Sequence, residues 1–346
     1  MNTRQSIKSL SHDELSSALC EMGLPRYRVS QLEQWLWQKG ATSFDEMTNL
    51  SKQLRASLAE RFSLSAPHIH TKQESADGTR KYLIQFDDNV MVETVGIPSH
   101  DAKRLTVCFS TQAGCAMGCT FCATGQGGFT RNLSIGEMVD QIRVVADDFG
   151  KRVTNVVAMG QGEPFLNYNA VLSALNIMNS KIGFEIGARH ITVSTCGILD
   201  GIYRFSQEPY QFTLAVSLHS AVQTTRDTIM PGVKNYKLTD LRDSLKVYGD
   251  TTKRRPTLEY APIQDVNDDD EHIDALINFC SGMLSHVNLI PLNPISQEQE
   301  KAGMLQPSSR LHYIENALLG ASIECSIRSS RGGDIDGACG QLRQRF

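Results

Sequence analysis

The stretch GCAMGCTFCATGQGG, residues 114–128, gathers three cysteines, Cys115, Cys119 and Cys122, in one short glycine-rich segment. A disulfide uses two thiols, and a structural zinc site normally uses four ligands. A cubane iron–sulfur cluster is usually held by four thiolates, so three protein ligands would leave one iron open to a small molecule. Zinc is the competing interpretation, but His100 and His190 are the nearest histidines before and after the segment. The spacing therefore favours a cluster.

Length and composition limit the class of protein around this segment. A chain of 346 residues can form one large α/β domain with a smaller appendage. Apolar runs of membrane-spanning length and a signal-peptide pattern are not found, so we expect a cytoplasmic protein with no membrane partner. The nine cysteines are then expected to be reduced. A net charge of −4 argues against simple electrostatic coating of nucleic acid.

The chain before the cysteine segment divides into two parts. Residues 1–63 contain amphipathic stretches and a capping box formed by Ser11 and Glu14, which predicts a small helical domain. Residues 64–103 alternate apolar and polar residues on either side of Asp87-Asp88-Asn89, which predicts a β-hairpin that links this domain to the remainder.

Residues 104–346 alternate between strand and helix patterns. The candidate strands are RLTVCFS, VTNVVAMG, HITVSTC, FTLAVSLH, TLEYAPI, HVNLIPL and SIECSIR. Repeated β–α units predict an α/β fold with a parallel sheet, either barrel-like or open and doubly wound.

Unusual residues follow most of these strands. The cysteine segment follows the first strand, and Gly160–Pro164 follows the second. Ser194 ends the third strand, Ser217-Leu218-His219 ends the fourth, and Asn293-Pro294 follows the sixth. Because β/α barrels build their active sites at the carboxyl ends of strands, we expect these residues to share one rim.

Cys-x-x-x-Cys-x-x-Cys after the first strand resembles the radical S-adenosylmethionine (SAM) enzymes. Together with CATGQGGFTRNLS, GEPFLN, VSLH, VNLIPLNP and RGGDIDGACGQL, it is similar to the RlmN/Cfr family of RNA adenine methyltransferases. The resemblance implies a partial (β/α)6 barrel with a small N-terminal helical domain. It also implies one [4Fe-4S] cluster on Cys115, Cys119 and Cys122 whose open iron is chelated by SAM. The implied SAM contacts are Gly162, Glu163, Ser194, Ser217, Leu218, His219 and Asn293.

Two further cysteines, Cys108 and Cys339, could simply be buried small apolar residues. The resemblance instead implies that Cys339 takes a methyl group from one SAM, and that a radical from a second SAM activates it. The methyl carbon then joins the adenine, and Cys108 releases the product by forming a transient disulfide with Cys339. Glu93 matches the family's proton acceptor, although Cys108 could take the proton itself.

The family contains two activities on one ribosomal adenosine. Gly162-Glu163-Pro164 resembles the branch that methylates C2 of adenosine 2503 in 23S rRNA, and often also adenosine 37 in tRNA; Gln161 and Gly337 depart from the usual pattern. Cfr-like C8 methylation is the alternative, and a non-catalytic zinc module is the alternative of a different class. Expected partners are protein-poor 23S rRNA, tRNA and an electron donor such as flavodoxin or ferredoxin, with the enzyme a monomer. The helical domain and Lys253–Arg255 are the candidate RNA contacts.

Overall fold

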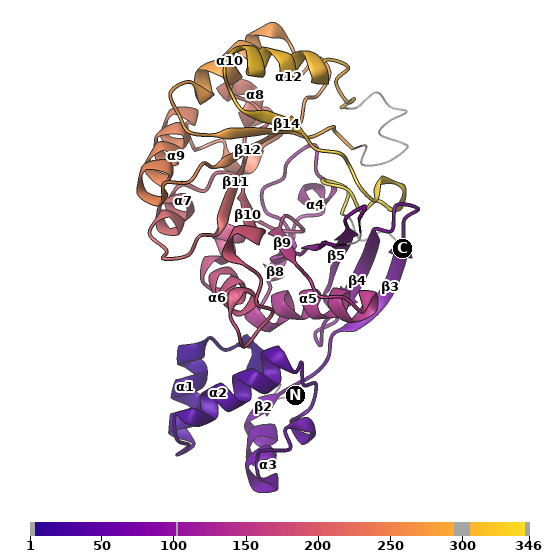
Figure 1. The fold of residues 1–346 in the computed structure, drawn as a ribbon, viewed down its shortest axis with the longest axis vertical. Coiled ribbons are helices and arrows are strands. Elements are labelled where there is room, and N and C mark those ends of the chain that lie inside the picture. The colour runs from indigo at the N-terminus through magenta and orange to yellow at the C-terminus, as the bar shows by residue number, and fades with distance from the viewer. Residues whose placement is uncertain (1–3, 102, 294–304, 343–346) are drawn as a thin grey trace.

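The computed structural model of the protein describes residues 4–101, 103–293 and 305–342. Its framework is a ten-stranded sheet in the order β14-β13-β12-β11-β10-β9-β6-β5-β4-β3 (Figure 1). In the described ranges, the seven strands from β6 to β14 run parallel and the other three antiparallel. The parallel strands are β6 (Leu105–Cys108), β9 (Asn155–Ala158), β10 (Ile191–Thr195), β11 (Thr213–Ser217), β12 (Thr257–Tyr260), β13 (His286–Leu289) and β14 (Cys325–Ile327).

Each predicted strand of residues 104–346 is present, and helices alternate with them. These helices are α5 (Ile135–Phe149), α6 (Tyr168–Asn179), α7 (Leu199–Ser206), α9 (Leu238–Thr252), α10 (Asp270–Cys280) and α12 (Leu311–Gly320). They follow the outer side of the curved sheet, while short α4 (Ala123–Gln126) lies on its inner side (Figure 1). The described part thus contains six β/α units followed by a seventh strand, which confirms the α/β prediction.

The predicted hairpin is formed by β4 (Arg80–Gln85) and β5 (Met91–Pro98), with Asn89 at φ 64° in the turn. It extends the main sheet, because β5 pairs with β6 and places Val95 opposite Cys108. A third strand, β3 (His68–Glu74), was not predicted. All seven of its residues are exposed, so its sequence lacks the apolar alternation that marks a half-buried strand.

The N-terminal segment, residues 4–63, is mainly helical as predicted and projects from one end of the molecule (Figure 1). It contains α1 (His12–Glu21), α2 (Tyr27–Glu33), a π-helical turn at Gln34–Gln38 and α3 (Lys52–Arg61); β1 (Gln5–Ser6) pairs with β2 (Phe62–Ser63). The predicted capping box of Ser11 and Glu14 caps the N-terminal end of α1. Lys8 and Asp140 of α5 join the segment to the sheet layer through an ion pair of 2.8 Å.

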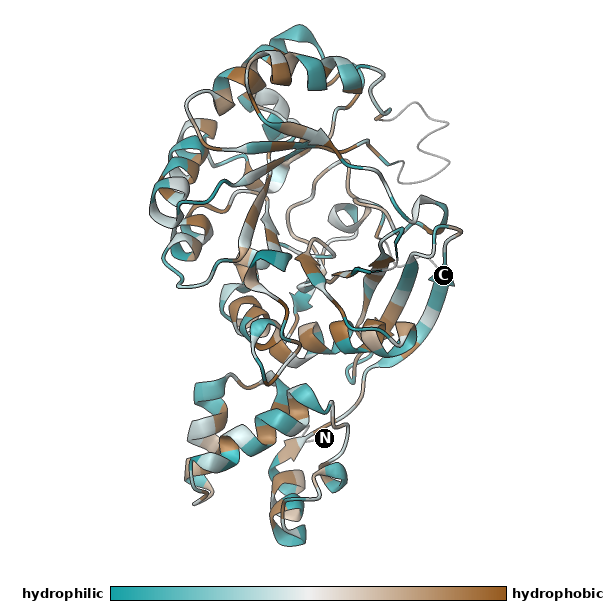
Figure 2. Ribbon diagram, in the orientation of Figure 1, coloured by the Kyte–Doolittle hydropathy of each residue, from teal (hydrophilic) through white to brown (hydrophobic). Residues whose placement is uncertain are grey.

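The remaining elements are short. They are β7 (Gln112–Gly114), β8 (Phe129–Asn132), α8 (Gln223–Ile229) and the 3-10 turns Ile7–Ser9, Phe44–Glu46, Pro164–Asn167, Ala188–His190, Pro231–Val233 and Gly333–Ile335. Figure 2 shows hydrophobic residues concentrated in the central strands and on α5 and α6, where the core lies. Within the described ranges, no helix is both long enough and apolar enough to cross a bilayer.

Candidate active site

A cavity of about 160 Å³ opens at the carboxyl ends of the parallel strands. The structure brings most of the predicted site residues to its wall: Cys115, Cys119, Cys122, Gly162, Glu163, Ser194, Ser217, His219, Asn293 and Cys339. Leu218 is fully buried and does not line it, and Pro294 lies outside the described residues. The predicted residues that line the cavity therefore share one rim at the strand ends.

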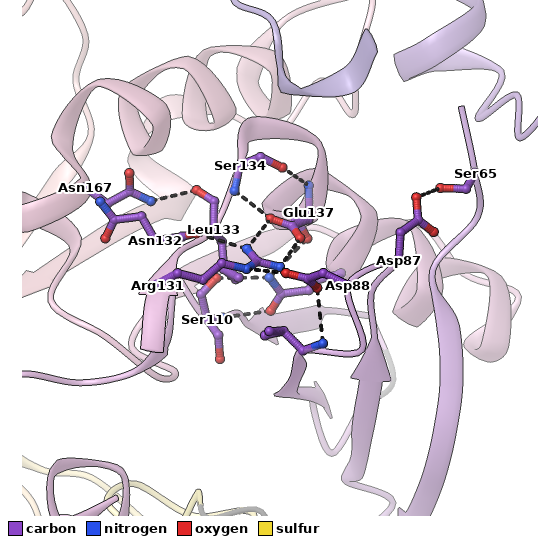
Figure 3. Close-up of polar contacts among 12 residues, drawn as sticks. Ser65, Asp87, Asp88, Ser110, Arg131, Asn132, Leu133, Ser134, Glu137 and Asn167 are labelled. Carbon is purple, nitrogen blue, oxygen red and sulfur yellow. Dashed lines mark hydrogen bonds and ion pairs between the residues drawn. The ribbon is translucent and has the colours of Figure 1, made fainter. Parts of the chain in front are cut away.

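The cysteine segment is held between β7 and β8. Gly114 has φ 73°, and a Cβ there would lie 2.0 Å from the carbonyl oxygen of Gly128, so this crossing requires glycine. Arg131 of β8 bonds to both carboxylate oxygens of Asp88 at 2.7 and 2.9 Å, and to those of Glu137 at 2.7 and 3.0 Å (Figure 3). These paired contacts tie the end of the segment to the hairpin turn and to the start of α5.

Burial is the main influence on the pKa of two of these thiols, Cys115 and Cys122. It raises the pKa of Cys115 to about 12, and it also raises the pKa of Cys122. The neighbouring sulfurs act in the same direction, because thiolates that lie close together repel each other. Three deprotonated thiols would need compensating positive charge in this place, which bound metal provides.

Glu163 and Gly162 form the wall after β9. The Glu163 carboxylate accepts the backbone N–H of Cys196 at 2.6 Å and that of Phe165 at 2.9 Å. Burial raises its pKa, and these two bonds oppose the rise. Gly162 has φ 107°, and a Cβ there would lie 2.6 Å from the side chain of Gln112, which accepts the Glu163 N–H. Only glycine fits this turn without moving Gln112.

His219 forms the opposite wall. Its Nδ1 accepts the backbone N–H of Ala261 at 3.1 Å, which assigns the proton of the neutral ring to Nε2. Burial lowers the pKa of His219 to about 3, so the ring is neutral at physiological pH. It meets Phe121 of the cysteine segment edge-on, with ring centroids 4.5 Å apart.

A second cavity, of about 240 Å³, is lined by both Cys108 and Cys339. Cys339 lines both cavities, and its carbonyl oxygen accepts the side-chain N–H of Asn293 at 3.2 Å. Burial raises the pKa of Cys108 to about 12, and the charge of Cys339 adds to this while Arg328 opposes it. Arg328 lines the same cavity, and its positive charge opposes the rise in the pKa of both thiols.

Glu93 lies on β5 with only 3% of its surface exposed. Its carboxylate is 3.3 Å from the Lys81 ammonium and accepts the side-chain N–H of Gln161 at 3.4 Å. Burial raises its pKa, and Lys81 opposes the rise. Glu93 lines neither cavity.

The chain matches two protein-family models. Residues 6–64 match the model of the "Ribosomal RNA large subunit methyltransferase N-terminal domain", and residues 109–276 match that of the "Radical SAM superfamily". A "Probable dual-specificity RNA methyltransferase RlmN" from Thermosynechococcus vestitus is 45% identical over 331 residues, which cover 96% of each chain. The protein of the same description from Alkaliphilus oremlandii is 44% identical over 339 residues, 97% of each chain. The chain belongs to the RlmN family of radical SAM RNA methyltransferases.

A solved relative has the same fold. The structure of a radical SAM methyltransferase from Sphaerobacter thermophilus matches with a TM-score of 0.88 and 41% identity, over 98% of this chain and 99% of that one. Membership of the radical SAM superfamily implies a [4Fe-4S] cluster and SAM as cofactors.

The residues present fit these cofactors. Three thiols from one loop face one cavity, and the remaining wall carries the polar groups of Glu163, Ser194 and Ser217. Three thiolates facing one cavity match a [4Fe-4S] cluster with one iron open to a small molecule, whereas a structural zinc site normally uses four protein ligands.

Two residues at the site, Glu259 and Arg328, were not predicted there. Glu259 lines the main cavity, where burial raises its pKa and the side chain of Asn288 donates a hydrogen bond to it at 3.2 Å.

The candidate RNA contact Lys253–Arg255 lies before the amino end of β12, opposite the cavity. Arg254 there donates to the carbonyl oxygen of Phe212 at 2.8 Å, so it supports the fold rather than the rim.

Proposed function

We propose that the chain methylates C2 of adenosine 2503 in 23S rRNA and of adenosine 37 in tRNAs, and that it consumes two SAM molecules per methyl group. The observation that carries this is the position of Cys339, which lines both the cavity of the cysteine segment and the cavity of Cys108. A methyl-carrying residue must reach a methyl donor and then a resolving thiol, and Cys339 borders both. The printed description of the relatives as dual-specificity RNA methyltransferases supports two classes of RNA substrate.

In this proposal Cys115, Cys119 and Cys122 hold the cluster, and Gly162, Glu163, Ser194, Ser217, His219 and Asn293 contact SAM, with Leu218 behind them. When bound, SAM would supply a methyl group to a thiolate without any electron transfer, and the cluster, once reduced by flavodoxin or ferredoxin, would supply the electron that gives a 5′-deoxyadenosyl radical from a second SAM. The neutral His219 ring offers an Nε2–H donor without adding charge to the cavity.

The work of the chain itself falls to the two thiols. The Cys339 thiolate would take the methyl group of one SAM, which leaves as S-adenosylhomocysteine. One hydrogen atom of that methyl group would pass to the 5′-deoxyadenosyl radical, and the remaining CH2 carbon would bond to the adenine carbon, giving an adduct with one unpaired electron. The adduct would return that electron to the cluster and lose the original hydrogen of the adenine carbon as a proton. The Cys108 thiolate would then attack the Cys339 sulfur: the S–S bond forms as the S–C bond breaks, the CH2 group takes up a proton to become the methyl group of the base, and an external thiol reduces the disulfide.

Two groups are candidates for accepting the proton. Glu93 is the family's expected base, but it is paired with Lys81 and lines neither cavity. Cys108 lines the cavity beside Cys339. If a Glu93→Gln variant still transfers the methyl group to RNA, Cys108 is the proton acceptor. If the variant methylates Cys339 but no longer methylates RNA, Glu93 is the proton acceptor.

The first test is mass spectrometry of the Cys339 peptide from cluster-loaded protein supplied with SAM, with Cys339→Ala as the control. We expect one added methyl group on Cys339. An unmodified Cys339 in such protein would contradict the proposal. Nucleoside analysis of treated 23S rRNA and tRNA transcripts, against 2-methyl- and 8-methyladenosine standards, then decides between C2 and the Cfr-like C8 product. The cytoplasm, where both RNAs are found, is the proposed location, and a monomer the proposed state.

A further inference from the structure

Arg226 is a buried cation on α8, behind the ends of two cavity-forming strands. Only 1% of its surface is exposed. Its guanidinium donates to three backbone carbonyl oxygens, those of Cys196 at 2.7 Å, Leu218 at 3.2 Å and Ser217 at 3.3 Å. No carboxylate of the described residues forms an ion pair with it. These contacts occupy the Nε and one terminal nitrogen of the guanidinium but do not neutralise its charge.

The charges that act on Arg226 come mainly from thiols. Burial lowers the pKa of Arg226, and the groups that oppose this are Cys196, then Cys119, and then Asp227. Cys119 is one of the three cysteines of the 114–128 segment, and the Cys196 side chain is hydrogen-bonded to it. A buried charge without a partner is strongly unfavourable, so a negative group is expected nearby in the functional protein.

The cysteine segment rests directly on the chain that carries Arg226. The N–H of Thr120 donates to the carbonyl oxygen of Ile229 at 3.0 Å, and the N–H of Gly232 donates to that of Met117 at 2.9 Å. Gly232 lies so close that a Cβ there would be 2.6 Å from the Met117 backbone. Arg226 itself does not line the cavity, so it is not placed to touch SAM or RNA.

We propose that Arg226 is the buried counter-charge of the [4Fe-4S] cluster and favours its reduced form. A cubane bound by three thiolates is negatively charged, and it gains a further negative charge when it accepts an electron from an external donor. A fixed cation beneath the segment stabilises the reduced form more than the oxidised form. The inference rests on the proposed function for the cluster, and it is independent of the RNA and of the adenine atom that is methylated.

The test is a redox titration of the reconstituted cluster without SAM or RNA, followed by electron paramagnetic resonance. In Arg226→Met we expect the reduction equilibrium to move about tenfold toward the oxidised form, or about 59 mV for one electron. Arg226→Lys keeps the charge and should retain most of the wild-type potential. Arg242→Met is the matched control, because Arg242 donates to the carbonyl oxygen of Phe279 at 2.8 Å but does not line the cavity. Equal potentials in all four proteins would overturn the proposal.

A second measurement separates charge from carbonyl bridging. Loss of the three carbonyl contacts should destabilise Arg226→Met equally with and without the cluster, whereas loss of the counter-charge matters only when the cluster is bound. The rise in thermal midpoint on cluster loading should therefore be smaller in Arg226→Met than in wild type or Arg226→Lys. An equal rise in all three would leave Arg226 as a purely structural residue.

Two remaining outcomes are also decisive. A folded Arg226→Met that loses iron while Arg226→Lys keeps it supports the counter-charge role. Loss of iron from both variants, with both unfolded before cluster loading, overturns it. A wild-type chain that takes up no cluster would contradict the cofactor itself and hence the proposed function, which is a different failure from equal potentials in fully loaded proteins.

Discussion

The buried ion pair between Lys8 and Asp140 fastens the N-terminal segment to α5. The Lys8 Nζ lies 2.8 Å from Asp140 Oδ1, and the two side chains are 5% and 14% exposed. Gly136 lies against Lys8 so closely that a Cβ on it would be 2.3 Å from the Lys8 Cβ. Replacing Lys8 by methionine keeps most of the apolar stem and removes the charge.

We expect Lys8→Met to lower the free energy of unfolding of this segment by about 3–5 kcal/mol at pH 8, the usual cost of removing one partner of a buried pair. The effect should depend on pH. Burial raises the pKa of Asp140 above its ordinary value of 3.8, and Lys8 opposes the rise, so without Lys8 the pKa climbs further. The folded state then binds a proton that the unfolded state has lost, and stability falls as pH rises from about 4. The variant should therefore be closer to wild type at pH 5 than at pH 8.

The assay is urea unfolding followed by tryptophan fluorescence, because both tryptophans of the chain, Trp35 and Trp37, lie in this segment. Lys8→Met combined with Asp140→Leu should recover most of the loss, since no charge is left buried alone. Lys72→Met is the control. The Lys72 side chain is 40% exposed, and its partner Asp148 would still form an ion pair with Arg80. We therefore expect this variant to lose less than about 1 kcal/mol of unfolding free energy. A Lys8→Met variant equally destabilised at both pH values, or not rescued by the second substitution, would refute the reasoning.

Three further predictions concern the site. Gly160→Ala would place a Cβ 2.7 Å from the Phe109 carbonyl group, and we expect it to lower the free energy of unfolding by about 1–3 kcal/mol and to reduce the bound iron. Gly320→Ala is the control, because a Cβ at Gly320 would have nothing within 4 Å, and it should change neither quantity. Urea unfolding and iron analysis measure the two effects. Arg328→Met should move the pH profile of Cys339 methylation upward, because Arg328 holds the raised pKa of that thiol down, and Arg328→Lys should move it less. A profile unchanged in both variants would argue against this influence of Arg328 on Cys339. The His219 ring should stay neutral throughout pH 5–9, since its pKa is lowered to about 3, and a chemical shift of its ring carbons that titrates near 6.5 would contradict this.

Much of the fold could be predicted because its signals are local. The seven parallel strands are short apolar runs separated by helical patterns, and the hairpin turn has its positive φ at Asn89. Strand β3 was missed because all of its residues are exposed and its place is set by pairing with β4. Local sequence cannot show such pairing.

The candidate site was predicted unevenly for a related reason. Strand-end residues such as Ser194 and Ser217 reach one cavity because parallel strands end on one side of the sheet. The sequence predicts that Arg328 is an exposed surface residue, because it lies near Arg331 in a polar, glycine-rich stretch. Its position in the cavity of Cys108 and Cys339 depends on the return of the C-terminal segment to β6, which brings together residues more than two hundred positions apart.

The cations near the site divide into two kinds. Lys8 and Lys81 each have a carboxylate within 3.3 Å, so their charge is balanced by the chain alone. Arg226 and the half-buried Arg328 form no ion pair with a described carboxylate. Cysteines are the first groups that raise the pKa of each arginine, Cys196 for Arg226 and Cys339 for Arg328, and the carboxylates of Asp227 and Glu259 add to this. Because an unbalanced buried cation is costly, the position of Arg226 favours thiolates in the three-cysteine segment. One arginine lies beneath the three-cysteine segment and the other beside the Cys108–Cys339 pair, and these are the two places where the proposed chemistry requires thiolates.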